Sequence, residues 1–71
     1  MAEKIVAHLR ALRSSRNITQ AELSQLVGVT RQTIIAIEKG NYTPSVLLAI
    51  KLARVLGVTV EEVFDYVDET S

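Results

Sequence analysis

The segment TQAELSQLVGVTRQTIIAIEKG, residues 19–40, contains two short helical patterns separated by a glycine. Thr19 and Glu22 have the spacing of a capping box, in which the threonine oxygen accepts an amide hydrogen bond and the glutamate reaches back to the N-cap. The helix that starts there is expected to end at Gly28, because glycine adopts the left-handed conformation of a helix C-terminus without strain. The second pattern occupies residues 31–39.

The two patterns and the turn between them have the layout of a helix-turn-helix unit, whose second helix enters the major groove of DNA. Thr30 is the expected N-cap of this second helix and Gly40 its stop. Its first turn, residues 31–33, holds no acidic residue, although helices commonly place acids there. The positive end of the helix is therefore left for an anion such as phosphate. The alternative is an ordinary solvated helix start.

Three further helices are expected around this motif, which itself covers about residues 19–39. Thr43 is the expected N-cap of the fourth helix, with Pro44 in its first turn. That helix is apolar almost all round, which is typical of a helix in the middle of its domain. No strand pattern is visible, so the sequence predicts an all-α fold of five helices. The remaining expected ranges are a first helix from Glu3 to about Ser15, a fourth from Ser45 to Leu56, a fifth from the capping box Thr59 to Glu62 as far as Phe64, and a frayed acidic tail over 65–71.

Length and composition limit the class of protein. At 71 residues the chain has room for a single small domain, residues 1–71, and its 48% of hydrophobic residues are too many for a disordered tail. No apolar run approaches the roughly 18 residues that a membrane span needs, and no signal-peptide segment is visible. The absence of cysteine excludes a disulfide framework and a thiolate metal site. A cytoplasmic location is therefore expected.

The net charge is zero, which argues against nucleic acid as a partner, since DNA-binding domains are usually basic. The charges are nevertheless unevenly placed. Residues 1–40 hold six basic and three acidic side chains, a net charge of +3, whereas residues 41–71 hold two basic and five acidic ones, a net charge of −3. A phosphate beside the first part would mainly sense that part, because salt screens more distant charges. The alternative is that sixteen charges are simply not spread evenly.

A family resemblance supports the helix-turn-helix interpretation. The motifs that carry it are Thr19-Gln20-Ala21-Glu22-Leu23, Gly28-Val29-Thr30-Arg31-Gln32-Thr33-Ile34, Ile37-Glu38-Lys39-Gly40, Pro44-Ser45, Lys51-Leu52-Ala53 and Leu56-Gly57-Val58. Together they resemble the phage-repressor (Cro/cI, XRE-type) helix-turn-helix family, and most of all its short stand-alone regulators. The resemblance covers about Leu9 to Phe64 and implies a compact Cro/cI repressor-like DNA-binding domain. Ser24 departs from the alanine that is usual in the family, but both residues are small.

The second motif helix supplies the candidate DNA-contacting residues. Ile34, Ile37 and Glu38 are expected to point inward. The remaining face is predicted to contact base edges through Arg31, Gln32, Thr33, Ile35 and Ala36. The amide of Gln32 matches adenine, and Arg31 can fork onto guanine or hold a phosphate. Ile35 can also be an incidental surface residue. The resemblance implies phosphate contacts at Gln20, Lys39, Asn41 and residues near Thr43 to Ser45, and the predicted phosphate set also includes Thr30 and Arg16.

Two further predictions concern packing and partners. Glu38 lies near the negative end of its helix and therefore requires a cation; the resemblance implies Arg13 as that partner, in a structural ion pair rather than a direct DNA contact. The C-terminal part holds more apolar residues than a short last helix needs. In the family this end often forms the two-fold dimer contact, which implies a dimer interface at Val58, Val60, Val63, Phe64 and Tyr66. The alternative is that these residues only close the core.

No sign of enzyme chemistry accompanies these motifs. His8 has no other ligand-type residue nearby in sequence and is interpreted as a surface or core histidine, not as a metal ligand. There is no nucleophile signature and no glycine-rich phosphate loop, so no enzyme activity, metal, cofactor or small-molecule ligand is expected. The resemblance implies a sequence-specific regulator of double-stranded DNA, a repressor that binds an inverted-repeat operator as a homodimer. The alternative is an antitoxin-like module that mainly holds a partner protein, with DNA binding secondary.

Overall fold

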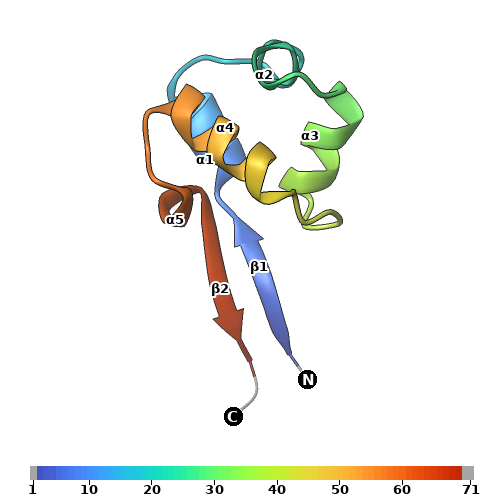
Figure 1. Ribbon diagram of the computed structural model, residues 1–71, viewed down its shortest axis with the longest axis vertical. Helices are drawn as coiled ribbons and strands as arrows, with labels where there is room; N and C mark the ends of the chain where they lie inside the picture. The colour runs from blue at the N-terminus through green and yellow to red at the C-terminus, as the bar shows by residue number, and fades with distance from the viewer. Residues whose placement is uncertain (1, 70–71) are drawn as a thin grey trace.

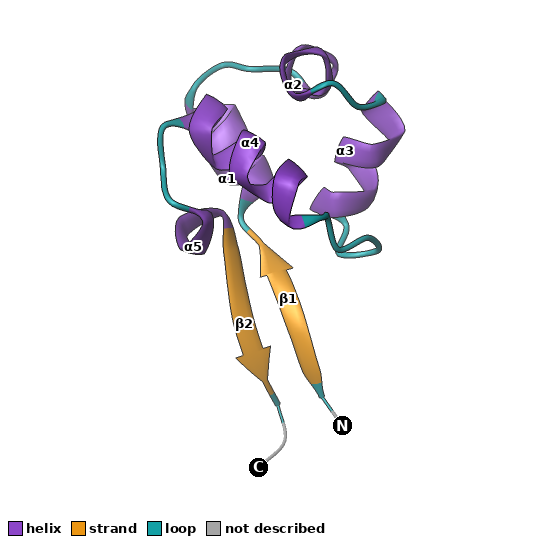
Figure 2. Ribbon diagram, in the orientation of Figure 1, coloured by secondary structure: helices purple, strands orange, loops and turns teal. Residues whose placement is uncertain are grey.

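The computed structural model describes residues 2–69, and within that range the chain forms a cluster of helices with a two-stranded ribbon projecting from it (Figure 1). The ribbon carries both ends of the chain away from the helices (Figure 2), and the molecule measures 39 × 22 × 21 Å. The elements, in chain order, are β1 (Glu3–Ala7), α1 (Leu9–Ser15), α2 (Gln20–Val27), α3 (Arg31–Glu38), α4 (Val46–Leu56), α5 (Val60–Val63) and β2 (Phe64–Asp68).

The two strands correct the all-α prediction. The segment expected to begin the first helix is instead the strand β1, and α1 starts only at Leu9. Residues 64–68, expected to be the end of a helix and a frayed tail, form β2, which pairs antiparallel with β1 so that Ile5 lies opposite Tyr66. Residues 70–71 of the expected tail lie outside the described range. The sequence did not predict these strands because each has only 5 residues and the two pair between opposite ends of the chain.

A single apolar cluster fixes the helices relative to one another. Its buried members come from α1 to α5 and are Leu9, Leu23, Val27, Ile34, Ile37, Leu48, Leu52, Ala53, Leu56 and Val63. Helix α4 contributes Leu48, Leu52 and Leu56 from one face, whereas Val46 and Leu47 at its start are 76% and 66% exposed. The expectation that α4 sits in the middle of its domain is therefore wrong for the side that carries Val46 and Leu47, which the other described elements leave uncovered.

Caps begin each of the later helices. Both predicted capping boxes are confirmed, with Thr19 and Thr59 accepting the amides of Glu22 and Glu62. The N-cap of α4 is not Thr43 as expected but Ser45, whose hydroxyl accepts the amide of Leu48 at 3.1 Å. The first helical residue is therefore Val46 and not Pro44, because the hydroxyl of Ser45 can accept the amide of the first turn.

Candidate nucleic-acid interface

The angle between α2 and α3 is set by a glycine and by buried side chains. Gly28 ends α2 in the left-handed conformation, with φ of 77°. Leu23 and Val27 of α2 and Ile34 and Ile37 of α3 all belong to the buried cluster. Because interiors are close-packed, these contacts fix the orientation of α3. The buried contacts with α2 thus hold the outer face of α3 in a fixed orientation.

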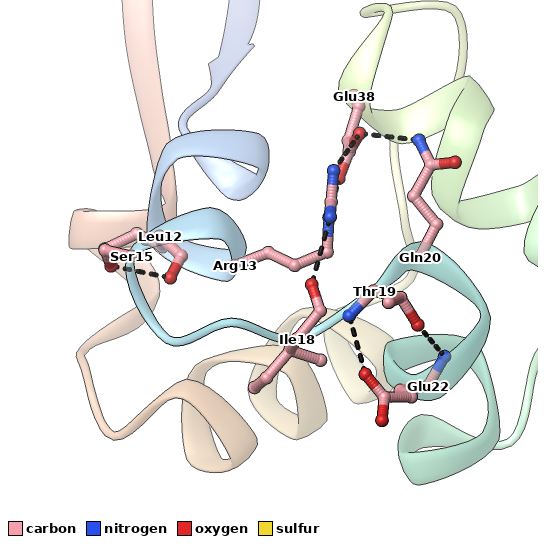
Figure 3. A network of polar contacts seen from close by, with 8 residues as sticks. All are labelled: Leu12, Arg13, Ser15, Ile18, Thr19, Gln20, Glu22 and Glu38. Atoms are coloured by element: carbon pink, nitrogen blue, oxygen red, sulfur yellow. Dashed lines mark hydrogen bonds and ion pairs between the residues drawn. The ribbon is translucent and has the colours of Figure 1, made fainter.

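A polar network joins α1, α2 and α3 beneath that face (Figure 3). Arg13 Nε donates to Glu38 Oε2 at 2.7 Å and Arg13 Nη2 to Glu38 Oε1 at 3.3 Å, so the ion pair is bidentate. Gln20 Nε2 donates to Glu38 Oε1 at 3.0 Å, and Arg13 Nη1 donates to the carbonyl of Ile18 at 3.0 Å. The side chains of Arg13 and Glu38 are only 12% and 6% exposed. The pair therefore ties the end of α3 to both α1 and α2.

The charge state of Glu38 follows from this network. Burial raises the pKa of its carboxyl, but the hydrogen bonds from Arg13 and Gln20, together with the charges of Arg13 and Arg10, outweigh burial and hold the pKa below its ordinary value. Glu38 is therefore ionised at neutral pH. Its negative charge offsets that of Arg13, so this pair adds no net charge to the surface above it.

An open groove with a positive excess lies between α1, α2 and α3. It has a volume of about 530 Å³ and is lined by Arg10, Arg13, Thr19, Gln20, Ala21, Arg31, Ile35, Glu38 and Lys39. Since Arg13 and Glu38 neutralise each other, Arg10, Arg31 and Lys39 give the groove a net positive charge, and all three are exposed. Such a groove can hold a polyanion through charge and through arginine hydrogen bonds.

A second groove lies where the helix-turn-helix meets the start of α4. Its volume is about 300 Å³, and its lining residues are Val27, Gly28, Val29, Thr33, Tyr42, Ser45, Leu47, Leu48 and Lys51. Helix α3 contributes Arg31 to the first groove and Thr33 to the second. Its exposed face is therefore bordered by two grooves, each with at least one cation.

The structure places the predicted base-contacting residues along this one helix. Arg31 and Gln32 are exposed, whereas Thr33, Ile35 and Ala36 are half-buried. The N-cap Thr30 accepts the amide of Thr33 at 3.3 Å, and the first turn of α3 holds no acidic residue. The first turn of α3 thus presents an arginine and a glutamine to solvent.

The predicted phosphate-contacting residues do not all lie together. Gln20 and Lys39 line the first groove, and Ser45 lines the second, where its hydroxyl is also the N-cap of α4. Asn41 and Thr43 are exposed in the loop before α4. Arg16, in contrast, lines neither groove.

Arg16 is held at the other end of α1. Its Nε donates to the carbonyl of Leu56 at 2.7 Å and its Nη1 to the carbonyl of Leu12 at 3.0 Å. It lines neither of the two grooves beside α3. Its guanidinium satisfies carbonyls at the C-termini of α1 and α4, a common role for a basic side chain at a helix end.

Sequence reasoning missed Arg10 and the exposed apolar stripe of α4. Arg10 lines the first groove beside Arg13, and the i, i+3 spacing of the two arginines on one helix is a signal that could have found it. The stripe consists of Val46, Leu47 and Ile50, which are 76%, 66% and 42% exposed. Its signal is a run of apolar residues immediately after the Ser45 cap.

The predicted dimer residues lie mainly against the core. Val63 is fully buried, and Val58, Val60 and Phe64 are half-buried and packed against the apolar cluster. Tyr66 is different: it is 61% exposed and donates a hydrogen bond to Glu3 Oε1 at 2.8 Å. This bond raises the pKa of Tyr66, with smaller contributions from burial and from Asp68.

Within residues 2–69, the side chain of His8 lies beside a single carboxylate. His8 Nε2 lies 3.3 Å from Asp65 Oδ2, and no group of three or more His, Cys, Asp or Glu side chains in this range could hold a metal ion. None of the helices described is both long and apolar enough to cross a membrane.

Comparison with known proteins places this geometry in a family. A helix-turn-helix family model matches residues 9–63. An uncharacterised HTH-type transcriptional regulator of Methanocaldococcus jannaschii is 51% identical over 61 residues, which cover 86% of this chain and 92% of the relative. The cryptic phage CTXphi transcriptional repressor RstR of Vibrio cholerae is 37% identical over 54 residues, or 76% of this chain and 49% of that protein.

A solved structure has the same fold over most of this chain. The restriction-modification controller protein C.AhdI from Aeromonas hydrophila superimposes with a TM-score of 0.71 at 31% identity, over 76% of this chain and 82% of its own. The family match begins at the first residue of α1 and ends at the last residue of α5, so that both strands lie outside it. The chain therefore belongs to the helix-turn-helix family of transcriptional regulators.

Proposed function

We propose that this chain is a sequence-specific DNA-binding repressor that places α3 in the major groove of its operator. The observation that carries the proposal is the exposed face of α3, which borders a groove whose net charge is positive. Phosphates would occupy that groove while the exposed Arg31 and Gln32 reach base edges. A regulator of this kind acts in the cytoplasm, where the DNA lies.

The contacts divide into two classes by the surroundings of each side chain. Arg10 and Lys39 line the positive groove and are expected to hold phosphates, together with Gln20 at the first position of α2. Gln20 would keep its bond to Glu38 and donate the second N–H of its Nε2 to a phosphate. Asn41 and Thr43 are exposed in the loop after α3 and extend the same phosphate path.

The proposal includes a homodimer on an inverted repeat. One chain offers one α3, and two copies related by a two-fold axis would place two such helices about 34 Å apart, one turn of DNA. Support comes from apolar side chains of the ribbon that a folded monomer leaves exposed, Ile5 on β1 and Tyr66 on β2. A repressing rather than activating role is supported by the relative that is named a repressor.

The test begins with selection of bound sites from a random DNA pool and then compares two double variants. Arg31→Ala with Gln32→Ala should abolish discrimination between the selected site and unrelated DNA, because both side chains that face base edges are removed. The matched control, Arg54→Ala with Gln25→Ala, removes the same two residue types from exposed positions on α4 and α2 and should keep discrimination. Both double variants should keep the helical circular dichroism spectrum of the unchanged chain. If the first variant still discriminates, α3 does not contact the bases.

A second function is favoured by one observation, the exposed stripe of Val46, Leu47 and Ile50. A stripe of that kind also suits an antitoxin-like protein that holds a partner protein through α4. Sedimentation separates the two: a chain that stays monomeric at micromolar concentration, with and without the selected DNA, would favour the protein partner. A dimer that Leu47→Asp leaves intact would favour the repressor, because the stripe on α4 then takes no part in the contact between the two copies.

A further inference from the structure

Beyond Ala7 and Phe64, which pack against the apolar cluster, the ribbon of β1 and β2 has little support from the rest of the molecule. It projects from the helices (Figure 1), and its polar contacts are exposed: Lys4 with Glu69 at 3.1 Å and Tyr66 with Glu3 at 2.8 Å. Exposed pairs of this kind add little stability, and an isolated two-stranded sheet is marginally stable at best in water. The ribbon therefore offers its edges for further pairing.

The residues that face outward along each edge follow from the hydrogen-bond pattern. His8 N donates to Val63 O at 2.7 Å, and Glu69 N donates to the carbonyl of Ala2 at 3.0 Å. In an antiparallel pair, hydrogen-bonded and non-hydrogen-bonded positions alternate. The residues between these two bonds alternate accordingly, so the main-chain N–H and C=O of Ile5, which lies opposite Tyr66, point away from β2. The main-chain groups that point away from the other strand are thus those of Glu3, Ile5 and Ala7 in β1 and those of Phe64, Tyr66 and Asp68 in β2.

Charge distinguishes the two edges. Strand β1 carries Glu3 and Lys4, a net charge of zero, whereas β2 carries Asp65 and Asp68, a net charge of −2. Two copies joined through β2 would bring four carboxylates together, while two copies joined through β1 would bring two acids and two bases. Like charges on paired strands are destabilising. The edge of β1 is therefore the better surface for a second copy of this chain.

The need for an assembly that closes at two copies also favours pairing between like strands. Pairing β1 of one copy with β2 of the next leaves a free edge at each end and continues into a fibre, whereas pairing one strand with its own copy across a two-fold axis closes at two chains. Alternation also places Ile5 and Tyr66 on one face of the ribbon, where they are 40% and 61% exposed. A partner strand beside β1 would cover the main-chain edge at Ile5 and extend this apolar row.

We propose that two copies of the chain pair β1 with β1 across a two-fold axis at Ile5, forming a four-stranded sheet in the order β2, β1, β1, β2. Ile5 then lies opposite Ile5 of the partner subunit, and Glu3 lies opposite Ala7 of the partner subunit. About six main-chain hydrogen bonds join the two strands. The inference rests on the homodimer of the proposed function and names the surface that forms it.

Cysteine crosslinking tests the pairing, because the chain contains no cysteine of its own. The full chain is made with Ile5→Cys and, as matched control, with Tyr66→Cys, the residue opposite it on the other strand. Directly paired residues at the axis lie about 5.5 Å apart between Cα atoms, within the range of a disulfide. Under mild oxidation at micromolar concentration, Ile5→Cys should crosslink at least about tenfold faster than Tyr66→Cys, because the pairing raises its effective concentration.

Sedimentation of the unmodified chain and binding to its selected DNA site complete the test. Faster crosslinking at Tyr66 than at Ile5, or equal rates at both, would overturn the β1 pairing. Crosslinking at neither position while the chain sediments as a dimer would also overturn it, yet leave the proposed repressor dimer intact. A chain that is monomeric, crosslinks at neither position and lacks site-specific DNA binding would remove the proposed function as well.

To exclude a folding effect, a second pair of variants is made by chemical synthesis with an N-methyl group on the amide of Ile5 or of Tyr66. Neither amide points toward the neighbouring strand, so the ribbon within one copy should be kept. Methylation at Ile5 should weaken dimerisation at least about tenfold, the loss of about 1.4 kcal/mol, and methylation at Tyr66 should not. The reverse result would assign the interface to β2.

Discussion

Glu38 shows how a single side chain supports the helix that carries the candidate DNA contacts. It lies at the last position of α3, where the negative end of the helix disfavours an acid, and it is 6% exposed. Three side-chain hydrogen bonds, two from Arg13 and one from Gln20, compensate for this position. Such a pair matters mainly because losing one partner leaves the other buried and charged.

Removing one partner of this pair should therefore destabilise the fold more than removing both. Arg13→Leu leaves the carboxylate of Glu38 buried with only Gln20 as a hydrogen-bond partner and should lower the free energy of unfolding by about 3 kcal/mol. The double variant Arg13→Leu with Glu38→Leu should lose clearly less. Urea unfolding followed by circular dichroism measures both, and a double variant at least as unstable as the single one would contradict this account.

The same carboxyl predicts a dependence of stability on pH. The pKa of Glu38 is lower in the folded chain than its ordinary value of 4.5, so the unfolded chain binds a proton more readily. Stability from this group is present above about pH 4.5 and is lost as pH falls through the folded pKa. Urea unfolding at pH 7 and at pH 3 should show a smaller pH-dependent loss for Glu38→Gln than for the unchanged chain. The pKa of Glu22 is also lowered, by its bonds to Thr19, so part of the acid loss should remain in Glu38→Gln.

At the scale of elements, the contribution of Gly28 to the turn between α2 and α3 depends on its backbone conformation alone. Gly28 has φ of 77°, and a Cβ added there would meet no atom within 4 Å. Gly28→Ala should therefore cost about 1–2 kcal/mol through the left-handed backbone, with no steric term. Gly28→Asn should cost less, because asparagine tolerates this conformation better. Urea midpoints rank the two variants, and equal losses would indicate a steric cause instead.

How far the elements could be predicted depended on the range of the interactions that form them. The caps at Thr19, Thr30 and Thr59 are bonds between residues three apart, so the sequence displays them directly. The strands depend on pairing between Ile5 and Tyr66, residues 61 positions apart in the chain, which no local pattern reveals. The hydrogen-bond partner of Arg16 could not be predicted for a similar reason, since it is the distant carbonyl of Leu56.

At the scale of the whole molecule, the charge division seen in the sequence becomes a division in space. The cations of the first groove, Arg10, Arg31 and Lys39, belong to the helices. The acids Asp65 and Asp68 belong to the ribbon, on the strand that carries the C-terminus away from the helices (Figure 2). The zero net charge is therefore the sum of a positive groove and an acidic ribbon, and a phosphate in the groove mainly senses the former.

This division predicts how salt affects DNA binding. Each phosphate neutralised by a cation contributes about 0.9 to the slope of log affinity against log salt concentration. Arg10→Gln removes one cation from the groove and should reduce the magnitude of that slope by about 0.9 on any DNA sequence, since a phosphate contact carries no sequence information.

The matched control for Arg10→Gln is Arg54→Gln, which removes an equal charge from an exposed position on α4 that lines neither groove. Fluorescence anisotropy of the selected site and of unrelated DNA, between about 50 and 200 mM salt, should show the reduced slope for Arg10→Gln only. Equal reductions in the two variants would mean that DNA senses net charge alone. Because the two variants have the same net charge, only the position of the lost cation can separate their slopes, and the structure places that position in the groove beside α3.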